Sequence, residues 1–261
     1  MFRKVFASAA LAAALLAGCN RAPTSTVAAL TPSSTPASSA TLAASPTTES
    51  SPSATTIAPV ISPCDFRPTP VAPPARPVAP PPNGAAPTDP DVVHAVIATD
   101  QGDIPLTLTP GKTPCTVLNF LSLAQQHFYD NTACHRLTTD GIFVLQCGDP
   151  TGTGTGGPGY SFADEYPIGT RAAPVPNASD TLYTRGVLAM ANSGPDTNGS
   201  QFFLITKDSP LPPHYTIFGS TDAAGLEVLD KVAEGGVIPG PMGENDGEPK
   251  LPVQILSVQG P

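Results

Sequence analysis

Residues 190–203 read Met-Ala-Asn-Ser-Gly-Pro-Asp-Thr-Asn-Gly-Ser-Gln-Phe-Phe, a polar stretch between two apolar runs. Its Gly194-Pro195 and Asn198-Gly199 pairs are strong loop signals, because proline fixes φ whereas glycine and asparagine tolerate positive φ. Alone, the stretch predicts a surface turn between two strands. Its backbone amides and carbonyls would also be open to a ligand, so the rest of the chain must decide between a turn and a binding site.

Composition excludes some classes of protein. The chain has 261 residues, 40% of them hydrophobic, and no tryptophan, which suits one domain of ordinary size with additional segments. Residues 91–261 hold 7 basic and 18 acidic side chains, a net charge of 7 − 18 = −11. Binding to phosphates requires a basic face, so nucleic acid is not expected as a partner.

The first 19 residues predict export. Arg3 and Lys4 precede an apolar run over 5–17 that is too short to span a bilayer, the pattern of a signal peptide. Leu16-Ala17-Gly18-Cys19 resembles a bacterial lipobox, in which the chain is cut before the cysteine and the cysteine is lipidated. We therefore expect a lipoprotein anchored through Cys19 to the outer face of the cytoplasmic membrane. The alternative is an ordinary secretory signal with a coincidental cysteine.

A Pro-rich segment follows the signal. Residues 20–90 are rich in Ala, Ser, Thr and Pro and hold 17 of the 34 prolines, without sustained helical or strand periodicity. Such a composition cannot bury enough apolar surface to offset ordering, so this segment is expected to be a disordered linker. The folded domain is then predicted over residues 91–261.

Hydrophobic periodicity in this domain predicts short strands and two helices. The first helix has Thr113 as N-cap and Pro114 in its first turn, followed by a stripe of Val117, Phe120, Leu121 and Ala124. The second helix spans 222–233. Many short strands with two helices indicate a mainly β fold, an antiparallel barrel capped by helices. The expected strands are 92–99, 104–108, 134–137, 143–147, 187–191, 202–206, 216–218 and 253–258.

Four further cysteines, an even number in an exported chain, permit two disulfides in three connectivities. Cys134 and Cys147 flank a predicted strand pair and could meet across it, and Cys64 could tie the end of the linker to Cys115. The sequence does not choose among the connectivities. The spacings match no metal motif, so no metal site is expected.

The segments around Arg136 and Gln146 carry candidate chemistry. Strand alternation sends His135 to one face and Arg136 to the other. An arginine that shares a face with a glutamine, near Phe143 and Val144, could donate hydrogen bonds to a weak acceptor in a semi-apolar groove. Each residue alone is weak evidence, since such a histidine is usually structural and such an arginine is usually a solvated charge.

Five motifs in register make the chain from about Val92 to Gln259 similar to the cyclophilins: His135-Arg136, Phe143 to Asp149, Gly154 to Gly157, Met190 to Phe203 and Tyr215 to Gly219. The resemblance implies a closed eight-stranded antiparallel β-barrel with a helix at each open end. It also implies cis–trans isomerisation of peptide bonds before proline, with no cofactor, on proline-containing polypeptides. A monomer is expected.

The resemblance assigns roles to individual residues. Arg136 matches the catalytic arginine of the family, and Gln146 matches a glutamine that binds near the substrate backbone. Ala191, Asn192 and Ser193 match the segment on which the substrate docks as an extra strand. The proline pocket would be formed by Phe143, Val144, Phe203 and Leu211, with His135, Gly154, Gln201 and Tyr215 lining the groove.

The chain departs from the family pattern at several positions. Val144 replaces a methionine, and Tyr215 aligns where many members have histidine. The segment 137–142 is about two residues longer than in common members, so the pocket rim should differ in shape. Pro210 stands where many members have tryptophan, and its presence should weaken cyclosporin binding more than catalysis.

Other functions fit the sequence less well than isomerisation does. Gly152 to Gly157 is glycine-rich, but no Gly-Lys-Ser/Thr follows it, so phosphate binding is disfavoured. A lipoprotein that captures small solutes would need two larger lobes. The serious alternative is a non-catalytic module that binds proline-containing peptides or holds unfolded clients in the same groove. The export signal and the resemblance together predict a function in the folding of exported proteins.

Overall fold

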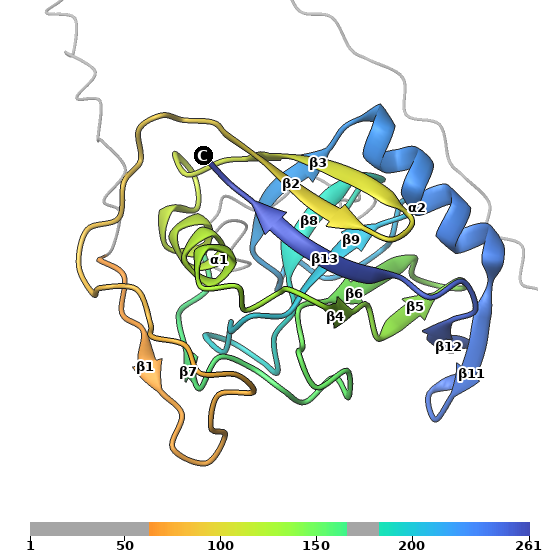
Figure 1. The fold of residues 1–261 in the computed structure, drawn as a ribbon, viewed down its shortest axis with the longest axis horizontal. Helices are drawn as coiled ribbons and strands as arrows, with labels where there is room; N and C mark the ends of the chain where they lie inside the picture. Colours follow the sequence, from red (N-terminus) through yellow and green to blue (C-terminus); the bar gives the residue numbers. More distant parts are fainter. Residues whose placement is uncertain (1–62, 166–182) are drawn as a thin grey trace, which may run out of the picture. The chain divides into compact units, whose positions relative to one another are not determined.

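The structure, a computed structural model, describes residues 63–165 and 183–261, and the predicted signal, Cys19 and the linker up to residue 62 lie outside these ranges. The described part is mainly β, with two helices on opposite sides of a strongly curled sheet (Figure 1). The helices are α1 (Pro114–Gln125) and α2 (Ala223–Gly235). The strands are β1 (Arg67–Pro68), β2 (Val93–Thr99), β3 (Gly102–Leu108), β4 (Thr132–Ala133), β5 (Arg136–Thr138), β6 (Val144–Cys147), β7 (Tyr160–Ser161), β8 (Val187–Met190), β9 (Phe202–Ile205), β10 (Ile217–Thr221), β11 (Val237–Gly240), β12 (Gly243–Pro249) and β13 (Gln254–Gln259).

The main sheet is antiparallel and has the order β11-β12-β5-β6-β9-β8-β10-β3-β2-β13-β4. All eight strands expected from periodicity are present, and they form the continuous run from β5 to β13. The expected closed eight-stranded barrel is not confirmed, because the described sheet has eleven strands and no ladder joins its ends. The additional strands are the short β4 at one edge and the β11–β12 hairpin at the other.

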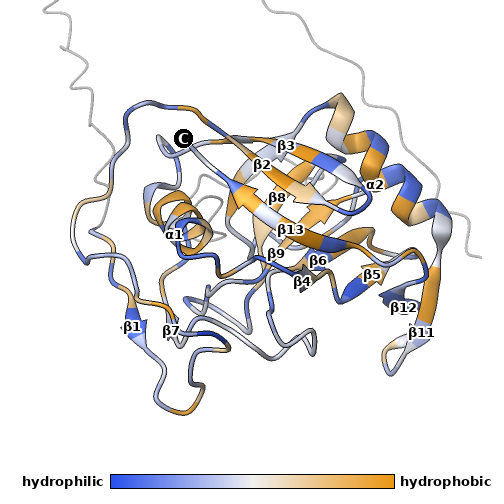
Figure 2. Cartoon of the chain, in the orientation of Figure 1, coloured by the Kyte–Doolittle hydropathy of each residue, from blue (hydrophilic) through white to orange (hydrophobic). Residues whose placement is uncertain are grey.

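The core lies inside the curl and against α1. Alternate residues of β2 and β3 are buried, as the two-residue period of a strand requires. Phe120 of α1 is fully buried, and its ring centroid lies 5.3–5.5 Å from those of Tyr129, Phe202 and Phe218. These offset and edge-on aromatic contacts add to the stabilisation from apolar burial. Figure 2 shows orange and blue alternating along α2, the pattern of a helix with one face on the sheet.

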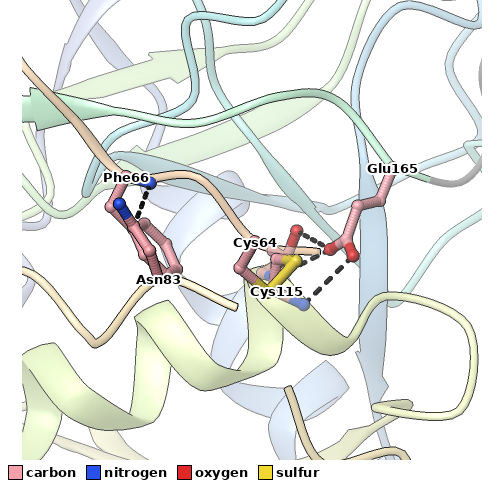
Figure 3. Close-up of a disulfide and its surroundings, with 6 residues drawn as sticks. Cys64, Phe66, Asn83, Cys115 and Glu165 are labelled. Atoms are coloured by element: carbon pink, nitrogen blue, oxygen red, sulfur yellow. Dashed lines mark hydrogen bonds between the residues drawn. A yellow bond between two sulfur atoms is a disulfide. The ribbon is translucent and has the colours of Figure 1, made fainter. Parts of the chain in front are cut away.

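The two helix N-termini are capped differently. Asp222 caps α2, as its side chain accepts hydrogen bonds from the amides of Ala224 and Gly225. Thr113 occupies the N-cap of α1, as expected, but its hydroxyl donates to the carbonyl of Thr109 instead of capping. Glu165 caps α1 from a distant loop: its carboxylate accepts from the amides of Cys115 and Thr116 at 3.0 and 2.7 Å (Figure 3). Burial raises the pKa of Glu165, and these hydrogen bonds oppose the rise.

The prediction of a disordered linker is wrong for residues 63–90, which lie along the domain beside α1 (Figure 1). Phe66 is 3% exposed, and its ring packs against those of Tyr160 and Phe162. β1 pairs with β7. The side-chain amide of Gln126 both accepts from and donates to the backbone of Ala79. Composition misled here because one buried aromatic and one cross-link hold the segment without any repeated apolar pattern.

The cross-link is one of two disulfides in the described residues, Cys64–Cys115 and Cys134–Cys147. This is the pairing that the sequence suggested without deciding it. Cys64–Cys115 joins the Pro-rich segment to the first turn of α1 (Figure 3), and Cys134–Cys147 joins the residue before His135 to the end of β6. Across residues 63–165 and 183–261, no helix is long and apolar enough to cross a membrane. The same residues contain no group of three or more His, Cys, Asp or Glu that could hold a metal ion.

Candidate active site

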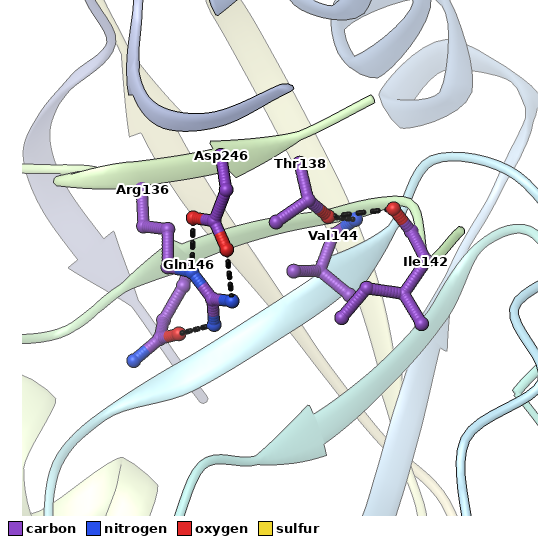
Figure 4. A network of polar contacts seen from close by, with 6 residues as sticks. All are labelled: Arg136, Thr138, Ile142, Val144, Gln146 and Asp246. Atoms are coloured by element: carbon purple, nitrogen blue, oxygen red, sulfur yellow. Dashed lines mark hydrogen bonds and ion pairs between the residues drawn. The ribbon is translucent and has the colours of Figure 1, made fainter. Parts of the chain in front are cut away.

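Arg136 begins β5 and is held on two sides (Figure 4). β6 places Gln146 directly opposite Arg136. The side-chain oxygen Oε1 of Gln146 accepts a hydrogen bond from Nη1 of Arg136 at 3.2 Å. β12 places Asp246 opposite Thr138, two residues along β5 and therefore on the same face as Arg136. The Asp246 carboxylate accepts from Nε and Nη2 at 2.7 Å each. This bidentate pair fixes the plane of the guanidinium, and it raises the pKa of Arg136.

A chain of hydrogen bonds continues from Gln146 to the glycine-rich loop. The side-chain NH₂ of Gln146 donates to the side-chain oxygen Oε1 of Gln201 at 2.9 Å. The Gln201 NH₂ donates in turn to the carbonyls of Gly154 and Gly156, each at 2.9 Å. Three residues assigned to the groove are therefore connected to Arg136, Gln146 directly and Gln201 and Gly154 through it. Because both amides use their donors and acceptors, the side chains are held in one orientation.

The glycine-rich loop is organised around Asp149. Its carboxylate accepts from the amide and hydroxyl of Thr151, both at 2.7 Å, and from the amide of Gly156 at 3.0 Å. Burial alone would raise the pKa of Asp149, but these hydrogen bonds outweigh it, so the pKa is lowered. Gly148 before it has φ +91°, and a Cβ there would lie 2.5 Å from the carbonyl oxygen of Ser200. The amides of Thr151 and Gly156 are therefore turned inward onto a carboxylate, and those of Thr153 and Thr155 onto threonine hydroxyls.

His135 lies beneath this loop, where a Cβ on Gly154 would be 3.4 Å from its ring. Among the described residues, no well-formed hydrogen bond reaches either ring nitrogen. Burial lowers the pKa of His135, although the nearby Asp149 carboxylate opposes this effect. A largely buried imidazole therefore packs under the glycine-rich loop, with the Asp149 carboxylate and the Gln201 side chain nearby. The structure thus places His135 as a support, and the prediction that it lines the groove stays a prediction.

His135 should make the stability of the protein depend on pH. The pKa of an unfolded histidine is about 6.5, and that of folded His135 is lower. The difference in pKa makes the free energy of unfolding depend on pH. The free energy of unfolding keeps its full value above pH 6.5 and decreases as the pH falls toward the folded pKa, because the unfolded chain takes up the proton first.

Urea unfolding measured between pH 7.5 and 5 should show this loss, and His135→Gln should reduce it. His127→Gln, a matched change at an imidazole that is 80% exposed, is the control. An identical pH profile for His135→Gln and the parent protein would contradict the assignment.

A second, smaller core lies beside Arg136. Val144, Phe203, Ala189, Ile205 and Tyr183 are buried there, with Ala191, Leu211 and Tyr215 packed partly buried around them. Tyr215 meets Phe203 edge-on, at 5.4 Å between ring centroids. Four of the residues expected in or near the proline pocket, Val144, Phe203, Leu211 and Tyr215, are therefore brought together. Such a partly open apolar cluster next to one strong donor can hold an apolar ring.

Phe143 is placed less centrally than the pocket prediction required. Its side chain is half-buried, and the Lys207 ammonium lies 4.7 Å from the centre of its ring. Its amide donates to the Ser209 hydroxyl at 2.8 Å. The longer loop before it is closed by Thr138, whose hydroxyl donates to the carbonyl of Ile142 and accepts from the amide of Val144 (Figure 4). Phe143 therefore lies at the rim of the cluster, and its predicted contact with proline stays a prediction.

Residues 190–203 divide into an open part and a buried part. After β8, no described residue pairs with the backbone amide or carbonyl of Asn192, whose side chain donates to the carbonyl of His214. The amide of Ser193 is bonded to Thr197. Farther on, Asn198 and Ser200 are fully buried, and the backbone of Asn198 pairs with Phe162. Asn192 thus offers a backbone free of described partners just after β8, and residues 193–197 are mostly exposed, as a surface turn should be, whereas Asn198 and Ser200 are buried.

Two residues of the site were not predicted from the sequence. Asp246 lies in Gly243–Pro249, a polar, glycine-containing run that reads as a loop and gives no strand signal. Tyr183 is fully buried, and its hydroxyl donates to the carbonyl of Tyr215 and accepts from its amide. Burial raises the pKa of Tyr183 to about 12, so it stays a donor. A buried arginine needs an anionic partner, and this requirement is the one signal in the sequence that points to a carboxylate such as Asp246.

Replacing Asp246 by alanine is expected to lower kcat for an Ala-Pro peptide about tenfold with a smaller change in KM, if Arg136 acts on the transition state. The loss of one charge-assisted pair at a partly exposed site is worth about 1–2 kcal/mol. Asp246→Asn keeps one acceptor and should lose less. Asp230→Ala, which removes the exposed ion pair with Arg185, is the matched control. A kcat for Asp246→Ala equal to that of the parent would show that Asp246 does not position Arg136.

An oriented guanidinium beside an apolar cluster, with an unpaired backbone at Asn192, is the arrangement of a class of protein that binds extended peptides. The family model described as cyclophilin type peptidyl-prolyl cis-trans isomerase/CLD matches residues 94–260. The chain belongs to the cyclophilin-type family.

The chain is similar to curated relatives and to solved structures. It is 54% identical over 177 residues to a protein of Mycobacterium tuberculosis named probable peptidyl-prolyl cis-trans isomerase B, covering 67% of this chain and 56% of that protein. It is 54% identical over 178 residues to the protein of the same name in Mycobacterium leprae, covering 67% of this chain and 59% of that protein. The chain thus spans a little over half the length of these relatives.

A crystal structure of a Cryptosporidium parvum cyclophilin type peptidyl-prolyl cis-trans isomerase superposes with a TM-score of 0.52 at 32% identity, over 65% of this chain and 98% of that one. A second structure of that protein, in the presence of the dipeptide Ala-Pro, gives 0.51 over 64% and 98%. Both support the fold described above.

Proposed function

We propose that this chain is a peptidyl-prolyl cis–trans isomerase that acts on X-Pro bonds of exported or cell-envelope proteins and so assists their folding. The observation that carries the proposal is Arg136, fixed by Asp246 and Gln146 beside the apolar cluster of Val144, Phe203 and Leu211. Membership of the family and the names of its relatives support it. Roles for the remaining groove residues follow from the resemblance.

The geometry suits the chemistry of proline isomerisation. The barrier of about 18–20 kcal/mol comes from amide resonance, and twisting the bond frees the lone pair on the prolyl nitrogen. Arg136 uses three of its five N–H groups on Asp246 and Gln146, which leaves two for a substrate. A hydrogen bond to the lone pair would form only near the transition state and would therefore accelerate the reaction. The apolar cluster would hold the ring while the Asn192 backbone holds the acyl side, and no nucleophile, base or cofactor is required.

The test is catalysed exchange of an Ala-Pro peptide by the full chain, followed by two-dimensional exchange NMR. Exchange that accelerates with enzyme concentration supports the proposal. Saturable binding without acceleration would overturn it in favour of the non-catalytic peptide-binding or holdase module. Cyclosporin added to the same assay should inhibit only weakly, because Pro210 stands where many family members have tryptophan.

We further propose that the chain is an exported lipoprotein anchored through Cys19 at the outer face of the cytoplasmic membrane. The lipobox-like Leu16-Ala17-Gly18-Cys19 motivates the anchor. Two disulfides suit an oxidising compartment outside the cytoplasm, which supports export. Globomycin, which blocks lipoprotein signal cleavage, should increase the apparent mass of the protein in cells. An unchanged mass and an unchanged membrane fraction would overturn the proposal.

The spacer between anchor and domain would be residues 20–62, since residues 63–90 belong to the folded part. Residues 20–62 lie outside the part of the chain that the structure describes.

A further inference from the structure

A pocket of about 750 Å³ opens beside Arg136, and the proposed reaction assigns no role to its outer lining residues. Arg136, Gln146 and His135 line its inner side, and Gly152 to Gly154 form one wall. The opposite wall is the β11–β12 hairpin, which carries Ile238, Pro239, Pro241 and Met242. The pocket therefore lies between the glycine-rich loop and a hairpin outside the core of the sheet.

The hairpin wall is apolar and exposed. Met242 is 77% exposed and Ile238 is 49% exposed, and these are two of the five large apolar side chains left exposed in the described residues. In Figure 2, β11 is orange and the adjacent β12 is blue. Apolar side chains that line a concave surface gain free energy when a ligand removes them from water. Methionine adapts to ligands of varied shape, which suits a site that receives different residues.

The charges around the pocket restrict what it can bind. Asp246 offsets the charge of Arg136 through the bidentate pair, so the pair together carries no net charge toward the pocket. Glu248 adds an exposed carboxylate on the hairpin wall. Gly152 and Thr153 on the other wall are neutral. An acidic side chain is therefore disfavoured, and an uncharged apolar one is favoured.

The pocket is continuous with the catalytic groove, because Arg136 and Gln146 line both. A polypeptide whose proline lies under Arg136 would therefore place a neighbouring residue close to this pocket. Resting on the proposed isomerase function, we propose that this pocket is a specificity subsite that receives a large apolar side chain, such as Leu, Met or Phe, from a residue flanking the proline of the substrate.

The subsite is tested with peptides that contain one Ala-Pro unit, assayed with the full chain. In one series a single Leu replaces Ala at one of the three positions before the unit, and in the other series at one of the three positions after it. The parent protein should prefer Leu over Ala at one position by about fivefold in kcat/KM. Met242→Ser and Ile238→Ser should bring that ratio close to one. Leu256→Ser is the matched control, because Leu256 is 47% exposed and does not line the pocket.

The outcomes separate the subsite from the reaction. A parent protein that isomerises the Ala peptides without preferring Leu anywhere overturns the subsite and leaves the isomerase intact. A preference that survives both hairpin variants, or an equal fall with Leu and Ala peptides, also overturns it, because the hairpin would then act through Asp246 or not at all. Absence of acceleration with every peptide counts against the isomerase itself, and binding of the Leu peptide measured by calorimetry would then decide the subsite alone.

Discussion

Replacing Arg136 by alanine is expected to lower kcat/KM for an Ala-Pro peptide by about 10²–10³-fold, the loss typical of removing one donor aimed at a transition state. Arg136 is the charged donor that Asp246 and Gln146 hold in place beside the apolar cluster of Val144 and Phe203. Gln146 is a neutral and therefore weaker donor, and one of its two N–H groups is already bonded to the side-chain oxygen of Gln201. The fold should persist, because the side chain is 31% exposed and packs in no core cluster.

The measurement is exchange NMR on the variant and on Arg185→Ala, which removes a surface arginine that is paired in a similar way with Asp230. Arg136→Ala also leaves Asp246 without its partner, so Arg136→Ala/Asp246→Ala should be assayed beside it. If Arg136→Ala and Arg136→Ala/Asp246→Ala lose activity equally and melt like the parent protein, the loss is due to Arg136. Full activity in Arg136→Ala would refute its catalytic role.

Replacing Cys64 and Cys115 by serine is expected to lower the free energy of unfolding by about 4 kcal/mol. The disulfide closes a loop with a sequence separation of 51, and the chain-entropy account gives about this value for such a loop. For a domain of this size, that corresponds to a fall in Tm of roughly 10 °C. Activity at 25 °C should remain, because neither cysteine contacts the residues around Arg136.

The matched comparison is Cys134→Ser/Cys147→Ser, whose loop has a sequence separation of 13 and is expected to contribute about 3 kcal/mol. These cysteines lie next to His135 and Gln146, so this variant should lose activity as well as stability. Thermal unfolding of both double variants, with kcat measured on each, distinguishes the two bonds. An unchanged Tm in Cys64→Ser/Cys115→Ser would mean that residues 63–90 are not held by the bond.

Local patterns were sufficient for most of the fold. Alternation predicted the strands around Arg136 and Gln146, and their shared face follows from the two-residue period. The helix with Pro114 in its first turn was predicted from proline and the spacing of Val117 and Phe120. The motifs of the family then named the cluster of Val144, Phe203, Leu211 and Tyr215 that the structure brings together.

Contacts between distant segments were not predictable in this way. Asp246 reaches Arg136 across 110 positions, from a run without strand periodicity, and Glu165 caps α1 from 50 residues downstream. Phe66 is a single aromatic in a Pro-rich segment, so neither composition nor periodicity reveals that it is buried. Whether the sheet closes also depends on its two edges, which no local pattern specifies.

The position of Cys64 also decides how the domain would bear a mechanical load. A pull on the chain at Pro63 reaches the covalent link to Cys115 after one residue, so the force enters the first turn of α1. Residues 65–90 and β2 are then shielded, because the bond bypasses them. An intact bond should therefore leave the sheet and the groove undistorted while the domain is under tension. In a reduced protein, the same pull would first peel residues 64–90 away from α1 and then load β2 directly.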